Sequence, residues 1–115
     1  MDDPVSAHEL AQLCKTLSVD TRVRILQLLQ DHPLCVNALA ARLGVTHSAV
    51  SQHLRIMKAA GLVRAEKRGY WVHYRRDDEA LQHWKDAILG LLGQQAGPSF
   101  FTSGLDARAD TDRKE

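Results

Sequence analysis

Residues 45–61 read VTHSAVSQHLRIMKAAG, and this stretch decides the fold. When it is drawn as a helix that turns about 100° per residue, its apolar side chains gather on one arc: Val50, Leu54, Met57, Ala60, Ala49 and Ile56. The opposite arc holds side chains that form hydrogen bonds or carry positive charge: His47, Ser48, Ser51, Gln52, Arg55 and Lys58. Thr46 offers a hydroxyl cap at the start, and Gly61 suits the end. The stretch therefore predicts an amphipathic helix that ends near Ala60.

The polar arc of this helix has an unusual composition. Many surface helices are simply solvated, but such faces favour Glu and Lys, whereas this one contains no acidic residue. Ser, Gln, His and Arg side chains can pair with base edges and phosphates. The composition therefore favours a DNA-reading face over plain solvation. His53 lies on the apolar arc, so we interpret it as a core histidine with a hydrogen bond, and not as a ligand or a base reader.

The segment before this helix completes a motif. LCVNALAARLG, residues 34–44, predicts a short helix that closes at Gly44, and a three-residue turn follows it. A short helix, a turn with glycine and a second helix form the helix-turn-helix motif, whose second helix enters the DNA major groove. Two earlier amphipathic helices are predicted within residues 6–17 and 18–33, the second with Ser18 or Asp20 as its N-cap.

The segment after Gly61 predicts a β-hairpin. LVRAEKRGYWVHYRR, residues 62–76, alternates apolar and polar residues around a turn at Arg68-Gly69. The residues predicted to face inward are Val63, Ala65, Tyr74 and either Trp71 or Val72. A cationic hairpin after a recognition helix is typical of a wing, and its tip residues Lys67, Arg68 and Tyr70 could reach the DNA backbone or minor groove. The alternative is an ordinary edge hairpin blunted by charge.

The last predicted element is an amphipathic helix that starts at Asp77 and Asp78. Its apolar side contains Leu81, Trp84, Ile88, Leu91 and Leu92. Such a terminal helix often pairs with its counterpart in a twin subunit, although Trp84 could equally complete the core of one subunit. The fold class is therefore mainly α with a small β-hairpin: a winged helix-turn-helix domain of about five helices over residues 1–93. Residues 94–115 are expected to form a flexible tail, with Phe100 and Phe101 as the residues that could dock.

Composition sets the wider limits. A chain of 115 residues with 44% hydrophobic and 25% charged residues fits one globular domain. The net charge of +1 conceals a basic segment, because residues 46–76 hold seven basic residues and one acidic residue, a net +6, whereas the rest carries −5. Two cysteines and an N-terminus without signal-peptide features predict a reducing cytoplasm. No apolar run approaches the roughly 18 residues that cross a bilayer, so membrane insertion is not expected.

Three segments together resemble a known family. DTRVRILQLL (20–29), LCVNALAARLGVTHSAVSQHLRIMKAAGLV (34–63) and RGYWVHYR (68–75) are similar to the small bacterial winged-helix repressors of the ArsR/SmtB type, which respond to arsenic and metals. The resemblance covers about residues 8–92. It implies a homodimer joined through its terminal helices, two recognition helices in successive major grooves of a palindromic operator, and release when an effector binds. By position, Ser48, Ser51 and Gln52 match the base-reading face, and Arg55 matches a backbone or base contact.

The identity of the effector stays open. Family members that sense arsenite or soft metals often carry Cys-Val-Cys on the third helix, but this chain has Cys35 followed by Asn37 at the second position. Arsenite needs three thiolates, which a chain with two cysteines could supply only across the dimer, for instance with Cys35 of one subunit and Cys14 of the other. Zinc accepts mixed ligands, such as Cys35 with His32 and Asp31. The family's zinc site on the last helix is present only in fragments: Asp77, Asp78, His83 and Asp86.

The two thiols also allow a redox hypothesis. Cys14 and Cys35 could form a disulfide or polysulfide that alters the dimer. Two simpler interpretations compete with it: Cys14 lies on an apolar helical face and could be a small core residue. Cys35 could fill space as well, although a helix start favours a reactive thiol.

An enzyme and a protein-contact module are the two alternatives to a DNA-binding regulator. An enzyme is not expected, because the sequence has no nucleophile elbow, glycine-rich phosphate loop or zinc-hydrolase spacing. The alternative to a DNA-binding regulator is a winged helix that serves only protein–protein contacts, since the fold alone does not imply DNA binding.

Overall fold

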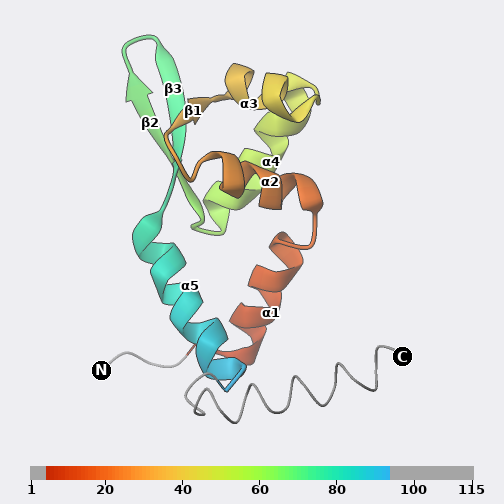
Figure 1. Ribbon diagram of the computed structural model, residues 1–115, viewed down its shortest axis with the longest axis vertical. Helices are drawn as coiled ribbons and strands as arrows, with labels where there is room; N and C mark the ends of the chain where they lie inside the picture. Colours follow the sequence, from red (N-terminus) through yellow and green to blue (C-terminus); the bar gives the residue numbers. More distant parts are fainter. Residues whose placement is uncertain (1–4, 94–115) are drawn as a thin grey trace, which may run out of the picture.

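The computed structural model describes residues 5–93, which form five helices and a small antiparallel sheet at one side of the molecule (Figure 1). In chain order the elements are α1 Ala7–Thr16, α2 Asp20–Leu28, β1 Leu34–Cys35, α3 Val36–Leu43, α4 His47–Ala59, β2 Val63–Arg68, β3 Trp71–Arg76 and α5 Asp78–Leu91. This order confirms the winged helix-turn-helix fold that the sequence predicts. The predicted tail, including Phe100 and Phe101, lies outside the described residues.

The two N-terminal helices form where the apolar periodicity predicts them. Ser6 caps α1, because its Oγ accepts a hydrogen bond from the Glu9 amide while the Glu9 carboxylate accepts one from the Ser6 amide. The predicted cap of α2 was wrong. Val19 occupies the N-cap without a side-chain hydrogen bond. Ser18 instead donates to the carbonyl of Lys15 at 2.8 Å, so its hydroxyl serves the end of α1.

The helix-turn-helix forms at the predicted positions. Gly44 ends α3 with a φ of 69°, a left-handed conformation that glycine adopts without steric cost. Thr46 starts α4, since its side-chain oxygen accepts a hydrogen bond from the Ala49 amide at 3.0 Å. Leu39 of α3 and Val50 of α4 are both fully buried. These caps and this packing fix the direction in which α4 leaves the turn.

The sheet has three strands, one more than the hairpin that the sequence predicts. Its strand order is β1-β3-β2, with every pair antiparallel. The short strand β1 places Leu34 opposite Tyr74 and Cys35 opposite His73. A two-residue strand leaves no periodic signal in a sequence, which explains why it was missed. The hairpin turn is also shifted by one residue, because Arg68 pairs with Trp71 and the loop is therefore residues 69–70.

The core lies between the helix-turn-helix and the base of the wing. Its buried side chains come from α1 to β2: Leu13, Ile25, Leu29, Leu34, Leu39, Leu43, Val50, Leu54, Met57, Leu62 and Val63. Of the predicted inward-facing hairpin residues, Val63 is buried and Tyr74 packs against the core. The prediction was wrong for Ala65, Trp71 and Val72, which are exposed. The outer half of the hairpin extends past the core, so the apolar side chains there have no core to pack against.

The helix α5 begins as the sequence predicts. The Asp77 carboxylate caps it by accepting a hydrogen bond from the Ala80 amide at 3.1 Å. Leu81, Trp84 and Ile88 pack partly against the core, whereas Leu91 and Leu92 near the helix end are 66% and 70% exposed. Figure 1 places α1 and α5 at the end of the molecule opposite the wing tip. None of the helices within residues 5–93 has both the length and the apolar character that crossing a bilayer requires.

Candidate nucleic-acid interface

The helix α4 presents the polar face that the sequence predicts. Its exposed side chains are His47, Ser48, Gln52, Arg55 and Lys58, and Ser51 is half-buried beside them. Val50, Leu54 and Met57 on the opposite side are buried, which fixes the rotation of the helix about its axis. The first turn of α4 contains no acidic residue. The positive end of the helix dipole is therefore not neutralised locally, which favours an approaching phosphate.

The wing carries the three predicted tip residues on its surface. Lys67, Arg68 and Tyr70 are exposed, and Tyr70 at the turn is 99% exposed. Gly69 makes the turn possible with a φ of 65°. The whole tip thus projects away from the core, where a neighbouring molecule could reach it.

One carboxylate modifies the charge of the wing. Glu66 pairs with Arg68 at 3.1 Å and with Arg75 at 3.2 Å. Hydrogen bonds from Arg68 and then Arg75 hold the pKa of Glu66 below its usual value. The charge count of the basic segment, made from the sequence, treats both arginines as unpaired. Their pairing could have been inferred only from the strand register, which places Glu66 between them on one face of the hairpin.

The predicted role of His53 is confirmed in its main feature. His53 is half-buried, and its Nδ1 accepts a hydrogen bond from Nε of Arg22 at 3.1 Å. The Arg22 guanidinium also donates to the carbonyl of Thr16 at 3.2 Å. Arg22 therefore joins the last residue of α1 to the middle of α4. One feature of the sequence points to this bridge, a basic residue within the apolar repeat of α2.

The environment of His53 makes folding stability depend on pH. Desolvation by burial, and secondarily the Arg22 charge, lower the pKa of His53 from its ordinary value of 6.5. The unfolded chain therefore binds this proton more tightly, and the His53 contribution to stability is lost as pH falls from about 6.5 through the lowered folded-state pKa. We expect the free energy of unfolding, measured with urea, to decrease between pH 7 and pH 5. His53→Gln should weaken this dependence, and an unchanged dependence in that variant would contradict the assignment.

The candidate effector residues do not assemble within one chain. Cys14 is exposed, so its interpretation as a core residue was wrong, because α1 turns that side away from the core. Cys35 is half-buried, and both thiols are free. His32 is exposed in the loop after α2. Across residues 5–93, no three His, Cys, Asp or Glu side chains lie close enough together to hold a metal ion.

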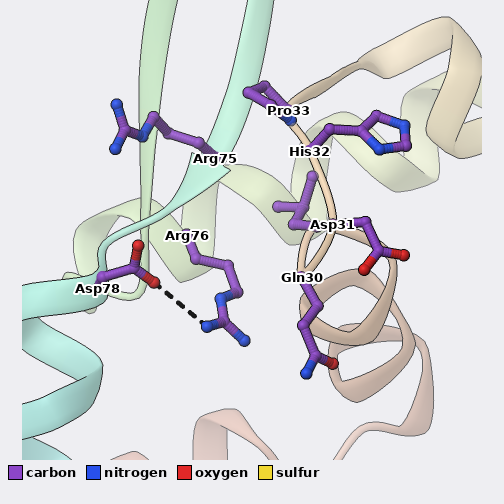
Figure 2. Close-up of a pocket in the computed structure, with 8 residues that line it drawn as sticks. Gln30, Asp31, His32, Pro33, Arg75, Arg76 and Asp78 are labelled. Carbon is purple, nitrogen blue, oxygen red and sulfur yellow. Dashed lines mark hydrogen bonds and ion pairs between the residues drawn. The ribbon is translucent and has the colours of Figure 1, made fainter.

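The loop that carries His32 borders a polar pocket of about 190 Å³ (Figure 2). Its lining comes from the end of α2, that loop, the end of β3 and the start of α5: Leu29, Gln30, Asp31, His32, Pro33, Arg75, Arg76 and Asp78. Arg76 pairs with Asp78 at 3.2 Å. In Figure 2 the side chains of Asp31 and His32 point away from Arg75. Cys35 does not line this pocket, so the predicted zinc set of Cys35, His32 and Asp31 is not formed there.

The acidic and histidine residues near α5 have other roles in this structure. Asp77 caps the helix, and Asp78 pairs with Arg76. His83 meets the Trp84 ring edge-on at 5.6 Å, and Asp86 accepts a hydrogen bond from Gln82. The residues that match the family's zinc site only in part are thus engaged in these contacts.

Comparison with known proteins gives a consistent result. The sequence profile described as "Bacterial regulatory protein, arsR family" matches residues 20–65. The chain is 40% identical to the HTH-type transcriptional repressor SmtB of Mycobacterium tuberculosis over 85 residues, which are 74% of this chain and 63% of that protein. It is also 40% identical to the arsenical resistance operon repressor of Escherichia coli over 65 residues, 56% of each protein. The chain thus spans less than two thirds of either relative.

A solved structure extends the similarity over nearly the whole chain. The ArsR-like transcriptional regulator from Rhodococcus sp. RHA1 is 30% identical and superposes with a TM-score of 0.67. The match covers 91% of this chain and 93% of that one. It therefore includes the helix-turn-helix, the wing and the terminal helices.

Proposed function

Because this chain belongs to the ArsR family of bacterial regulatory proteins, we propose that it is a homodimeric transcriptional repressor that leaves its operator when an effector acts on it. The observation that carries this proposal is the exposed, acid-free face of α4. That face starts at a capped N-terminus, directly after the helix-turn-helix turn. A protein-contact module has no need of a face restricted to hydrogen-bonding and basic side chains.

The polar face contains side chains suited to base contacts and side chains suited to phosphate contacts. Ser48, Ser51 and Gln52 lie near the start of α4, the part of a recognition helix that meets base edges in the major groove. Arg55 and Lys58 lie further along the same face and suit phosphates. His47 and the Thr46 cap stand at the helix entrance. The wing would add Lys67, Arg68 and Tyr70 on the flanking backbone or minor groove.

The terminal helices support a twin subunit. Leu91 and Leu92 leave apolar surface exposed at the end of α5, away from the wing. Burying such surface against a second copy would produce a two-fold axis and, with it, two recognition helices. A palindromic operator follows from that symmetry, because each half-site would meet an identical α4. Binding to DNA would place the protein in the cytoplasm.

The relatives support the repressor role and the class of effector. One of them is named for arsenical resistance, and the other is a repressor by name. For this chain we propose a thiol-reactive agent, or a metal or metalloid such as arsenite, zinc or another soft metal, received at Cys35. A metal would need donors from both subunits, for example Cys14 of one and Cys35 of the other.

The experiment that tests the function is a fluorescence-anisotropy titration of the reduced protein onto the DNA upstream of its own gene. We expect tight, specific binding, and release by arsenite, zinc or a thiol oxidant that Cys35→Ser abolishes. Binding no tighter than to scrambled DNA of the same length would contradict the proposal. It would favour the protein-contact module.

A pair of variants separates base contacts from backbone contacts. Gln52→Ala should change the preference among operator sequences, because an amide on the front of α4 can read base edges. Arg68→Ala should weaken binding to all sequences alike, because a wing guanidinium meets phosphates. Titrations against a set of operators with single base changes measure both effects. Equal loss of discrimination in the two variants would contradict this division.

A further inference from the structure

Arg22 links three helices through two hydrogen bonds, which together form the Arg22 bridge. Its Nε donates to Nδ1 of His53 in the middle of α4 at 3.1 Å. Its Nη1 donates to the carbonyl of Thr16, the last residue of α1, at 3.2 Å. Arg22 itself belongs to α2. One polar side chain thus joins the recognition helix to both N-terminal helices.

The two ends of the bridge respond differently to acid. Nδ1 of His53 can accept a hydrogen bond only in the neutral imidazole, because both ring nitrogens of the imidazolium are donors. Protonation therefore breaks the bond to Nε of Arg22 and places two positive charges next to each other. The Thr16 carbonyl does not titrate, and it lies at the negative end of the α1 dipole, which favours the guanidinium. Acid thus leaves Arg22 on α1 and releases α4.

The charges around His53 set the pH at which the bridge opens. Desolvation by burial, and then the charge of Arg22, hold the pKa of His53 below its ordinary value of 6.5. Within residues 5–93, Arg22 is the one charged residue whose field acts on this imidazole. His8 and Glu9 of α1 line a cavity nearby, but neither contributes to the shift. The bridge is therefore closed at neutral pH and opens below about pH 6.5.

The cavity beside the bridge leaves room for α4 to move. Its volume is about 380 Å³, and its walls include Thr16 of α1, Ile56 of α4 and Trp84 of α5. Ile56 lies one helical turn after His53 on the same side of α4. Side chains therefore do not fill the space between α1 and this part of α4, although protein interiors are normally close-packed. A shift of α4 at this point meets little steric resistance.

We propose that the Arg22 bridge is an acid-sensitive device that positions the recognition helix, so that protonation of His53 opens it and lowers the affinity for the operator. The inference rests on the proposed function, because it assigns an acid response to the same DNA-binding face. His53 directly follows Gln52 and precedes Arg55 by two residues. The bridge thus holds α4 at the level of the side chains that read bases. Recognition groups work only when they are held within about 0.5 Å, so a small shift of α4 is enough.

Protons and operator DNA compete under this proposal. If protonation weakens operator binding, linkage requires that the operator weakens protonation by the same factor. Binding to DNA of unrelated sequence depends on positive charge, to which a protonated histidine adds. Acid should therefore lower the preference for the operator without lowering nonspecific binding.

The test compares anisotropy titrations at pH 7.5 and pH 5.5, on the DNA upstream of the chain's own gene and on scrambled DNA of the same length. In the unmodified protein we expect the ratio of the two affinities to fall about 5-fold, the low end of coupling between two sites. His53→Gln keeps an oxygen that can accept from Arg22 but takes up no proton, so its ratio should stay nearly constant. His83→Gln removes an exposed histidine of α5 and should show the full decrease. The remaining histidines, including His47, are common to these proteins and cancel in the comparison.

Arg22→Leu opens the bridge at every pH. We expect its affinity ratio at pH 7.5 to match that of the unmodified protein at pH 5.5, and to change little between the two. Circular dichroism at both pH values shows which chains are folded. If Arg22→Leu does not fold, His53→Gln decides the question, because it retains the bridge.

Two outcomes would overturn the inference: an equal decrease of the ratio in the unmodified and His53→Gln proteins, or a ratio that does not fall in the unmodified protein. Failure of the repressor proposal is distinguishable, because the unmodified protein would then show no preference for the upstream DNA even at pH 7.5. A preference at pH 7.5 with the wrong response to acid contradicts the bridge alone.

Discussion

Replacing Ser51, Gln52 and Arg55 together with alanine abolishes operator recognition, with an expected loss of at least ~100-fold in affinity. Each good base contact contributes about 1–3 kcal/mol of discrimination, and the triple variant removes the centre of the polar face of α4. The fold should survive, because alanine favours helices and none of the three side chains is buried in the core. Anisotropy titration measures the affinity, and circular dichroism measures the helix content.

The conservative variant Arg55→Lys serves as the matched control. It keeps the positive charge near the phosphates while removing the planar guanidinium, so most of the nonspecific affinity should remain. Specific binding that survives in the triple variant, with unchanged circular dichroism, would show that the DNA-reading face lies elsewhere on the molecule.

Raising the salt concentration from about 50 to 200 mM weakens operator binding by roughly 10⁴-fold, because each neutralised phosphate releases counterions. Ion pairs reduce, without removing, the contribution of some of these charges. Within the described part of the basic segment, Arg68, Arg75 and Arg76 already pair with carboxylates. Four basic residues carry no such ion pair: Arg55, Lys58, Arg64 and Lys67. A dimer would thus carry eight of them, and the slope of log affinity against log salt measures how many meet phosphates.

Glu66→Gln sharpens this prediction. Surface pairs of this kind contribute about 0–1 kcal/mol, so the fold should tolerate the change. Loss of the carboxylate releases Arg68 and Arg75, which should raise DNA affinity and steepen the salt dependence. A salt response that stays flat in both proteins would contradict electrostatic DNA binding and favour a protein-contact role.

Local patterns predicted most of the helical fold. Local signals, each set by residues within one helical turn, can be recognised in the sequence. They include the apolar repeats, the Thr46 cap and the Gly44 terminator. The prediction of the N-cap of α2 was wrong because Ser18 lies between the end of α1 and the start of α2. Its hydroxyl donates a hydrogen bond to the end of α1. The strand β1 was missed because it forms only against β3, almost forty residues later. This strand therefore depends on tertiary contacts and not on the local sequence.

The candidate site follows the same division. The polar face of α4 was predictable because a helical wheel fixes which side chains share a side. The bond between Arg22 and His53 joins residues 31 positions apart, and no local pattern specifies it. In the sequence, Glu66 is a single acidic residue within a basic segment. Only the register of β2 against β3 places it between two arginines. The exposure of Cys14 likewise depends on how α1 is turned against the rest of the domain.

The attachment of the wing at its base has a thermodynamic consequence. β1 binds β3 on one edge, and the Asp77 amide donates to the Leu62 carbonyl at 2.9 Å directly below the first strand pair. The hairpin thus leaves the domain already held on both of its strands. Ordering a loose arm on a ligand costs conformational entropy, whereas a preorganised arm has lost that entropy before the encounter. The wing can therefore add contacts at its tip while most of its backbone ordering is supplied by folding.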